Sequence, residues 1–292
     1  MTEKAYCGQP EGISYCSIHI DMDDNQWVIP RQRNTAFDVS AAEQYSKAAR
    51  NIERFLASYP VTLFLVGLDI RVDAKVRAIE RLRRDCSNVE IANHSLSHNN
   101  NFTCLSHEDR RKEVVEADRI IKDAFDLDCL YGYRSPGYVF NGEILEILRE
   151  NNYVYDASCF PSFYGPILRT LNLVLNGVSG RSNYGAFRNG FLPNEPTPMD
   201  AGRELFEINV SVCPFLRCPI HYSIIRSTIV YAILARFIRR IRHLTFLFHL
   251  YDFLDVDVSK MQYVLALITS GRRLVLSKDI DKYCARDRGN PK

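Results

Sequence analysis

Three aspartates stand close together near the start of the chain, in the order Asp21-Met22-Asp23-Asp24. They come at the end of residues 15–22, which have the composition of a strand, and side chains on a strand alternate between its two faces. Asp21 and Asp23 would therefore share one face, with Asp24 on the other. Two neighbouring carboxylates repel each other when both are ionised, and a bound cation removes that conflict. The alternative interpretation is a polar loop that caps the following turn.

A pair of histidines four residues apart, His94 and His98, follows the apolar residues 89–93. Imidazoles at this spacing converge if the loop makes one helical turn, which presents both of them to one zinc ion. The pair alone is weak evidence, because surface histidines reach this spacing by chance. Combined with an aspartate from another strand end, it gives two histidines and one carboxylate, with positions left open for water and substrate. That set suits hydrolysis with zinc or a related divalent ion.

Three further polar segments follow predicted strands. Arg134 could hold a carboxylate in a fixed, ionised orientation, and the turn at Gly137 could direct a backbone N–H toward a developing oxyanion. Asp156 and His249 each follow an apolar strand, and a histidine in that position could act as a general acid. Each segment also has a structural interpretation: an ordinary turn with a surface arginine, or a core histidine whose hydrogen bonds are satisfied.

The elements that must position these groups alternate between strand-like and helix-like patterns. This alternation predicts an α/β architecture, in which the loops at the carboxyl ends of the strands form the site. Residues 163–203 are rich in glycine, proline and asparagine, as expected for long loops over a site. Strands are expected at residues 15–22, 61–66, 89–93, 129–133, 153–155, 205–212, 245–250 and 273–276, and helices at 40–56, 73–84, 106–125, 141–150, 222–242 and 260–270.

Composition narrows the class of protein. The 292 residues, 46% of them hydrophobic, suit a single domain spanning residues 1–292, and a net charge of +2 gives no drive toward nucleic acid. The nine cysteines contain no Cys-x-x-Cys pair, and residues 1–12 lack the apolar core of a signal peptide. These features predict reduced thiols in a cytoplasmic protein. No stretch approaches the roughly 18 apolar residues of a transmembrane helix, which leaves peripheral membrane contact as the compatible mode.

The order and spacing of the five polar clusters resemble those of the polysaccharide deacetylases, also called the NodB-homology or carbohydrate esterase family four enzymes. The similarity extends from about Tyr15 to Leu276; HSLSH and RSPGY are its most specific segments, and YDASCFPS and FHLYDF strengthen it. The resemblance implies a deformed (β/α)7 barrel whose C-terminal half is elaborated at about residues 163–245. The D-x-D form of the first motif is nearest to a bacterial branch found among surface-polysaccharide and lipopolysaccharide enzymes.

The resemblance also implies a catalytic set. Asp21 would be the general base that deprotonates the attacking water, and Arg134 would hold Asp21 in place. The backbone amide of Gly137 would help to stabilise the tetrahedral oxyanion. His249 would protonate the departing amine, with Asp156 tuning it.

The metal ligands implied by the resemblance are Asp23, His94 and His98, binding zinc or, alternatively, cobalt, nickel or manganese. Two departures from the family pattern bear on the site. The family has adjacent aspartates followed by glycine, so Asp24 is an alternative ligand to Asp23. Gly137 stands where many relatives have a larger residue, which would open the acyl pocket.

The implied reaction is removal of the N-acetyl group from an amino sugar during cytoplasmic assembly of a surface glycan, the sugar being carried on a nucleotide or a polyprenyl lipid. An alternative is N-deformylation of a 4-formamido sugar on a nucleotide or undecaprenyl carrier, because one methyl group changes binding by only about 1–3 kcal/mol. Hydrolysis of cyclic imides ranks third. A non-enzymatic alternative is a catalytically inactive, sugar-binding relative, although every residue of the expected catalytic set is present.

Residues outside these clusters receive a structural interpretation or a weaker functional one. The helical pattern of residues 222–242 contains five arginines and no acid, which suits a phosphate or anionic sugar, or simply a solvated helix face. His19 shares a strand face with Asp21, and we expect it to be a buried polar residue below the site. The remaining histidines, assigned no role, are His107, His221 and His243.

Overall fold

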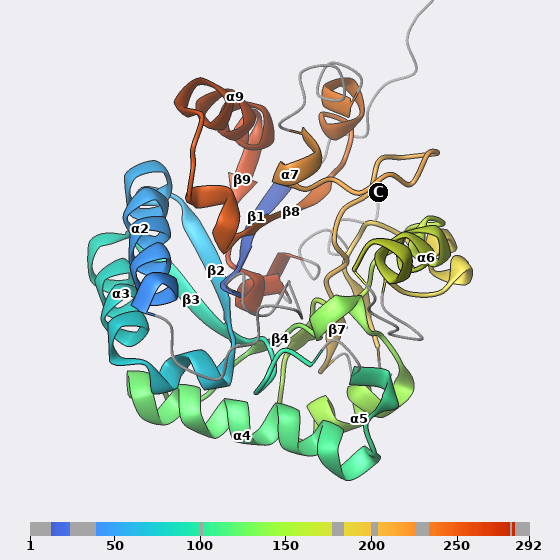
Figure 1. Cartoon of the computed structure of the whole chain (residues 1–292). Helices are drawn as coiled ribbons and strands as arrows, with labels where there is room; N and C mark the ends of the chain where they lie inside the picture. The colour runs from blue at the N-terminus through green and yellow to red at the C-terminus, as the bar shows by residue number, and fades with distance from the viewer. Residues whose placement is uncertain are drawn as a thin grey trace, which may run out of the picture.

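The computed structural model describes residues 13–23, 39–99, 102–176, 184–199, 204–225, 234–280 and 282–283. Its centre is a nine-stranded sheet in the order β6-β7-β5-β4-β3-β2-β1-β8, with β9 paired to β1 (Figure 1). All pairs are parallel except that of β6 with β7. The strands are β1 (Ser14–Asp21), β2 (Pro60–Leu65), β3 (Asn88–Asn93), β4 (Gly132–Tyr133), β5 (Tyr155–Asp156), β6 (Thr197–Pro198), β7 (Phe206–Glu207), β8 (His243–His249) and β9 (Arg272–Leu274).

The sheet curls so that its two ends approach each other. The chain that continues β7 first joins the end of β5, where Val210 N donates to Cys159 O over 3.1 Å. It then reaches β8, where Ser211 N donates to Thr245 O over 3.3 Å and Thr245 N donates to Ser211 Oγ over 2.9 Å. These contacts link strands that stand at opposite ends of the pairing order. The expected deformed barrel with helices around it is confirmed.

Helices cover the outer face of the sheet; in Figure 1, α2 and α3 lie at its left and α4 and α5 run beneath it. Ser106 starts α4 as expected, because its side chain accepts a hydrogen bond from Asp109 N, and two acids lie in the first turn. Asn141 caps α5 in the same way through Ile144 N. The helices are α2 (Val39–Leu56), α3 (Asp73–Asp85), α4 (His107–Phe125), α5 (Gly142–Glu150), α6 (Gly165–Asn176), α7 (Tyr222–Ile225) and α9 (Val258–Thr269).

Short 3-10 segments connect several of these elements. They are η2 (Gly67–Arg71), η3 (Phe102–Cys104), η4 (Pro136–Tyr138), η5 (Phe187–Phe191), η6 (Leu250–Phe253) and η7 (Ser277–Asp279). Two of them follow strands closely: η4 begins shortly after β4, and η6 begins directly after β8. They therefore shape the edge of the sheet where the predicted catalytic groups lie.

Several predictions of secondary structure need correction. The strands expected at 129–133 and 153–155 are paired only over Gly132–Tyr133 and Tyr155–Asp156. Residues 163–203 are not loops throughout, because α6 begins at Gly165-Pro166, and proline is favoured in the first turn of a helix. The strand expected at 205–212 is paired as β7 only over Phe206–Glu207, since the chain then turns away toward β8. The helix expected at 222–242 does not reach its expected end: residues 234–238 are helical, but 239–240 form a turn, and 226–233 lie outside the described residues.

The alternation of side chains along the strands divides the interior into two regions. Ile18 and Ile20 of β1 belong to the large core between the sheet and its helices. The other face of β1 carries Ser17, His19 and Asp21, which are buried and polar. The barrel interior is therefore polar beside the C-terminal half of β1. In the part of the chain that the structure describes, no helix is long and apolar enough to cross a membrane.

Candidate metal centre and active site

The parallel register brings the predicted site residues together at the carboxyl end of the sheet. Asp21, the last residue of β1, is opposite Phe64 of β2 on one side and His249 of β8 on the other. On the far side of β2, Asn93 of β3 is the partner of Tyr133 of β4, so the next residues along these two strands, His94 and Arg134, are also neighbours. Residues that are more than 200 positions apart in the chain thus converge because parallel strands end at one edge.

The three expected metal ligands form one cluster. One potential ligand atom from each of Asp23, His94 and His98 lies within 4.8 Å of the others, and all three side chains are buried. His94 Nδ1 is 2.8 Å from Arg134 O, so Nδ1 carries the proton and Nε2 presents its lone pair to the cluster. Burial lowers the pKa of both histidines, which keeps them neutral. Asp24, the alternative ligand, lies outside the described residues.

The loop that carries the two histidines is fixed by local hydrogen bonds. Ser95 N donates to Asn93 Oδ1 over 2.8 Å, and His98 N donates to Ser95 Oγ over 3.1 Å. Ser95 and His98 both have left-handed backbone conformations, with φ of 68° and 48°. This tight turn sets the imidazole centroids of His94 and His98 4.9 Å apart. One carboxylate and two neutral imidazoles, already gathered, match the donor set of a divalent metal with open coordination positions.

The groups around Asp21 keep its carboxylate ionised. Its Oδ1 accepts a hydrogen bond from Arg134 Nη1 over 2.6 Å. Its Oδ2 lies 3.9 Å from Nε2 of His94 and 3.9 Å from Nε2 of His249. Burial alone would raise the pKa of Asp21, but the charge and hydrogen bond of Arg134, together with the neighbouring His94 and His249, outweigh burial and lower that pKa to about 2. The carboxylate therefore has one oxygen occupied and the other directed at the two histidines.

Arg134 is fully buried, and every side of its guanidinium has a partner. Nε donates to Ala157 O over 2.9 Å, and the group lies 4.1 Å from the centre of the Phe64 ring. Nη2 is 2.6 Å from His19 Nδ1, and His19 Nε2 is 2.6 Å from Ser277 Oγ. Since arginine can only donate, His19 accepts at Nδ1 and donates at Nε2. Burial lowers the pKa of His19 well below its usual range, which agrees with a neutral ring.

His19 was expected below the site and lies there, but its contact with Arg134 was not predicted. The available signal was its place two residues before Asp21, which puts both side chains on the same face of β1. Through Arg134, His19 belongs to the chain of groups that orients Asp21.

His249 has a different carboxylate neighbour from the one expected. Asp252 Oδ2 accepts a hydrogen bond from His249 N over 2.9 Å and lies 4.0 Å from His249 Nδ1. Tyr251 stacks on the imidazole with ring centroids 4.9 Å apart. Asp252 was visible in the FHLYDF segment, three residues after His249, a spacing that a single helical turn brings together.

The predicted pairing of Asp156 with His249 is not seen among the residues described, and Asp156 instead bonds to Ser158. The reason is the alternation of side chains along β5. Tyr155 points into the barrel and donates to Glu90, so its neighbour Asp156 points to the outer face. There it lies opposite Glu207 of β7, and burial raises the pKa of Asp156 to about 7.

The turn that contains Gly137 is held from two sides. Ser135 N donates to Ser158 Oγ over 2.8 Å, and Ser158 Oγ in turn bonds to Asp156. On the other side, Tyr184 N donates to Gly137 O over 2.6 Å. Gly137 has φ of 63° and ψ of 21°, a left-handed conformation that glycine adopts without steric cost. Asp156 thus contacts the predicted oxyanion turn through Ser158.

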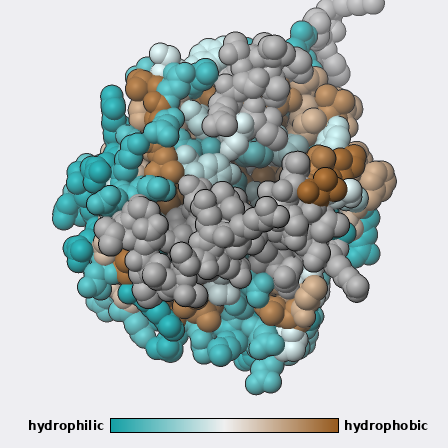
Figure 2. Space-filling view, viewed as in Figure 1, coloured by the Kyte–Doolittle hydropathy of each residue, from teal (hydrophilic) through white to brown (hydrophobic). Residues whose placement is uncertain are grey.

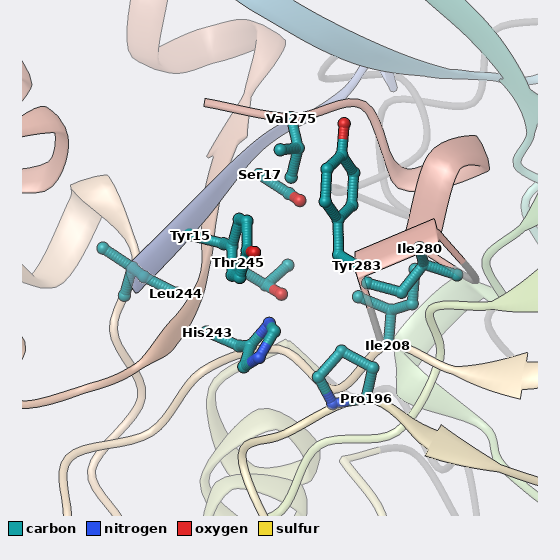
Figure 3. Close-up of a pocket in the computed structure, with 10 residues that line it drawn as sticks. All are labelled: Tyr15, Ser17, Pro196, Ile208, His243, Leu244, Thr245, Val275, Ile280 and Tyr283. Carbon is teal, nitrogen blue, oxygen red and sulfur yellow. The ribbon is translucent and has the colours of Figure 1, made fainter. Parts of the chain in front are cut away.

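A small pocket lies at the opposite end of the barrel (Figure 3). It is lined by Tyr15 and Ser17 of β1 and by His243 and Thr245 of β8. Tyr15 pairs with His243, six residues before the pair of Asp21 with His249, so the pocket is about 20 Å from the metal ligands. His243 stacks on Tyr15 with ring centroids 5.1 Å apart, in keeping with the structural role expected for it.

The comparisons with known proteins agree with this geometry. A family model described as polysaccharide deacetylase matches residues 35–155, which include His94, His98 and Arg134. The predicted resemblance to that family is therefore confirmed. No curated protein matches the sequence.

Two solved structures share the fold. A presumed polysaccharide deacetylase from Mycobacterium smegmatis is 15% identical with a TM-score of 0.60, the similarity covering 100% of this chain and 99% of that one. The 4-alpha-glucanotransferase of Thermococcus litoralis is 13% identical with a TM-score of 0.54, covering 94% of this chain and 38% of that one. At these identities the two structures establish the barrel architecture and nothing finer.

Proposed function

We propose that the protein hydrolyses the N-acyl group of an amino sugar, using a divalent metal held by Asp23, His94 and His98. The observation that carries the proposal is the position of Asp21, which is ion-paired with Arg134 and lies between the metal ligands and His249. A base, a ligand set and an acid thus meet at one edge of the sheet. The match to the polysaccharide deacetylase model supports this class of reaction.

A divalent metal at this ligand set would polarise the acyl carbonyl and lower the pKa of a water molecule. The protein's own groups then handle the protons. Asp21 Oδ1 is held by Arg134, so Asp21 Oδ2 is the oxygen left to accept a proton from the attacking water. Because the pKa of Asp21 is lowered to about 2, this oxygen is unprotonated at neutral pH.

In this proposal His249 completes the reaction as the acid. Its Nε2 is 3.9 Å from Asp21 Oδ2, so the group that takes a proton and the group that gives one face the same space. The stacked Tyr251 ring supports the imidazole in that direction, and the backbone hydrogen bond from His249 N to Asp252 holds the turn that carries it. The Gly137 amide, on a turn that is held from both sides, would donate to the oxygen that gains negative charge.

The acyl group we propose is acetyl. Gly137 carries no side chain on the predicted oxyanion turn, which would leave room there for the methyl group that distinguishes acetyl from formyl. The amino sugar we propose is an intermediate of surface-glycan assembly on the cytoplasmic side, linked to a nucleotide or a polyprenyl phosphate. An anionic carrier fits the excess of arginine in the second half of the chain.

The test is incubation of zinc- or cobalt-loaded protein with N-acetylated and N-formylated amino sugars on nucleotide and on lipid carriers, followed by mass measurement of the released acid. Acetate release supports the proposal, and release of formate alone would replace acetyl by formyl. If no acid is released from any compound by protein that demonstrably holds metal, hydrolysis is wrong and a sugar-binding relative is the better interpretation. The His94→Ala variant, carried through the same protocol, is the matched control.

A further inference from the structure

Exposed hydrophobic side chains gather on one part of the molecule. Of the eleven large hydrophobic residues exposed in the described part of the chain, seven lie on three neighbouring segments. Figure 2 shows such residues on the side of the molecule where α6 lies. We call this surface the apolar face, and it consists of Ile167, Leu171 and Val174 on α6, Phe187 and Phe191 on η5, and Phe215 and Leu216 in the loop before α7.

The part of the apolar face on α6 is a stripe. Ile167, Leu171 and Val174 are spaced by four and three residues, so they lie on one side of the helix, and Val174 is 74% exposed. Leu168, on another side of α6, packs against the core cluster that contains Phe160. The helix therefore presents apolar residues both to the protein and to its surroundings, which is unusual for a helix that faces only water.

The three segments are fixed to one another. The Phe163 ring, just before α6, has its centroid 5.0 Å from that of Phe187 and 5.1 Å from that of Phe191. Arg217, next to Leu216, donates to Pro161 O over 3.0 Å and also to Leu192 O. The apolar face is thus a single built surface and not a set of unconnected side chains.

The charge of this half of the chain is predominantly positive. Residues 157–251 contain ten arginines, no lysine and four acidic residues, whereas the whole chain has a net charge of only +2. Residues 157–194, which include α6 and η5, contain no acidic residue at all. Arg188 is exposed between Phe187 and Phe191 in the sequence. Hydrophobic side chains accompanied by arginine favour a partner that is both apolar and anionic.

The apolar face is also close to the site. Tyr184, between α6 and η5, donates to Gly137 O, and its ring lies 6.1 Å from that of Tyr138. Arg169 of α6 donates to Gly185 O over 2.7 Å, which ties the helix to the same segment. A partner bound at the apolar face would therefore lie beside the turn that contains Gly137, at the carboxyl end of the sheet.

We propose that the apolar face docks on the surface of an anionic lipid bilayer, with its hydrophobic side chains entering the interface and the exposed Arg188 contacting phosphate headgroups. A second copy of this chain is a poorer partner, because two apolar faces in contact would bring arginines of like charge together. Docking is a separate property from hydrolysis, since neither the ligands nor the catalytic groups belong to this surface.

The test is co-sedimentation of the full chain with vesicles of phosphatidylcholine, alone or mixed with phosphatidylglycerol. We expect binding to the mixed vesicles that weakens as salt is added. The double variant Leu171→Ser with Phe191→Ser should reduce it by about tenfold or more, since each buried apolar side chain contributes on the order of 1–3 kcal/mol. The control variant, Val258→Ser with Tyr263→Ser, changes exposed hydrophobic residues on α9 and should bind like the unchanged protein.

Three results would overturn the proposal. The first is no binding to either kind of vesicle, and the second is an equal loss of vesicle binding in both double variants. The third is a dimer in gel filtration that only Leu171→Ser with Phe191→Ser abolishes, while no vesicle is bound. Because all four substituted side chains are exposed, their loss leaves no cavity. Thermal melting followed by circular dichroism checks that both variants are folded.

Discussion

Arg134 Nη1 and Asp21 Oδ1 are 2.6 Å apart, and both side chains are buried. Replacing Arg134 by glutamine would leave the Asp21 carboxylate buried without its counter-charge. Breaking a buried ion pair on one side costs on the order of 3–5 kcal/mol in the free energy of unfolding. We expect a loss of that size in urea denaturation.

The control for this prediction is the double variant Asp21→Asn with Arg134→Gln. It removes both charges, so its loss of stability should be smaller than the sum of the two single losses. Additive losses would show that the two groups do not stabilise each other in the folded protein.

Metal uptake should depend on the two histidines. With either His94 or His98 replaced by alanine, the cluster keeps one imidazole, and we expect the protein to lose its stoichiometric zinc or cobalt after dialysis, as measured by elemental mass spectrometry. Asp21→Asn is the matched control: it should retain metal but lose turnover, because the amide cannot accept the proton from water. Full metal content in both histidine variants would place the metal elsewhere.

The arrangement of this site was predictable from the sequence to the extent that it depends on strand ends. Asp21, His94, Arg134 and His249 each follow an apolar run, and parallel strands necessarily bring such positions to one edge. Helix starts at Ser106 and Asn141 were predictable too, because these residues cap helices through local hydrogen bonds.

The partner of His249 could not be predicted in the same way. Which face Asp156 occupies depends on the register of β5, and two paired residues leave too little periodicity to show it. The helix α6 was missed because its asparagines and its glycine-proline start resemble loop composition.

Asp252, and not Asp156, should control the environment of His249. Asp252→Asn keeps the shape of the side chain but removes the charge 4.0 Å from His249 Nδ1. We expect it to move the ring resonances of His249 in a carbon–nitrogen NMR spectrum and to lower kcat with little change in KM. Asp156→Asn should leave those resonances in place, because Asp156 acts on the Gly137 turn through Ser158. Displaced His249 resonances in Asp156→Asn alone would restore the pairing predicted from the sequence.

A second buried acid, Glu90, should make stability depend on pH. Burial raises the pKa of Glu90 to about 7, against hydrogen bonds from Tyr155, Lys278 N and Thr62 that lower it. Below the unfolded value of 4.5, both states are protonated and Glu90 has no effect. Between 4.5 and 7 the unfolded chain loses the proton first, so the folded state binds more protons and stability falls as pH rises.

Replacing Glu90 by glutamine should therefore remove a pH-dependent loss. Glutamine resembles the protonated acid, with one oxygen for Thr62 and Lys278 N and an amide group toward Tyr155. Relative to the unchanged protein, Glu90→Gln should gain on the order of a few kcal/mol in unfolding free energy between pH 4 and pH 8. Urea denaturation at a series of pH values measures this difference. A constant difference across the series would mean that Glu90 is already ionised in the folded protein, and that its three donors outweigh the cost of burying its charge.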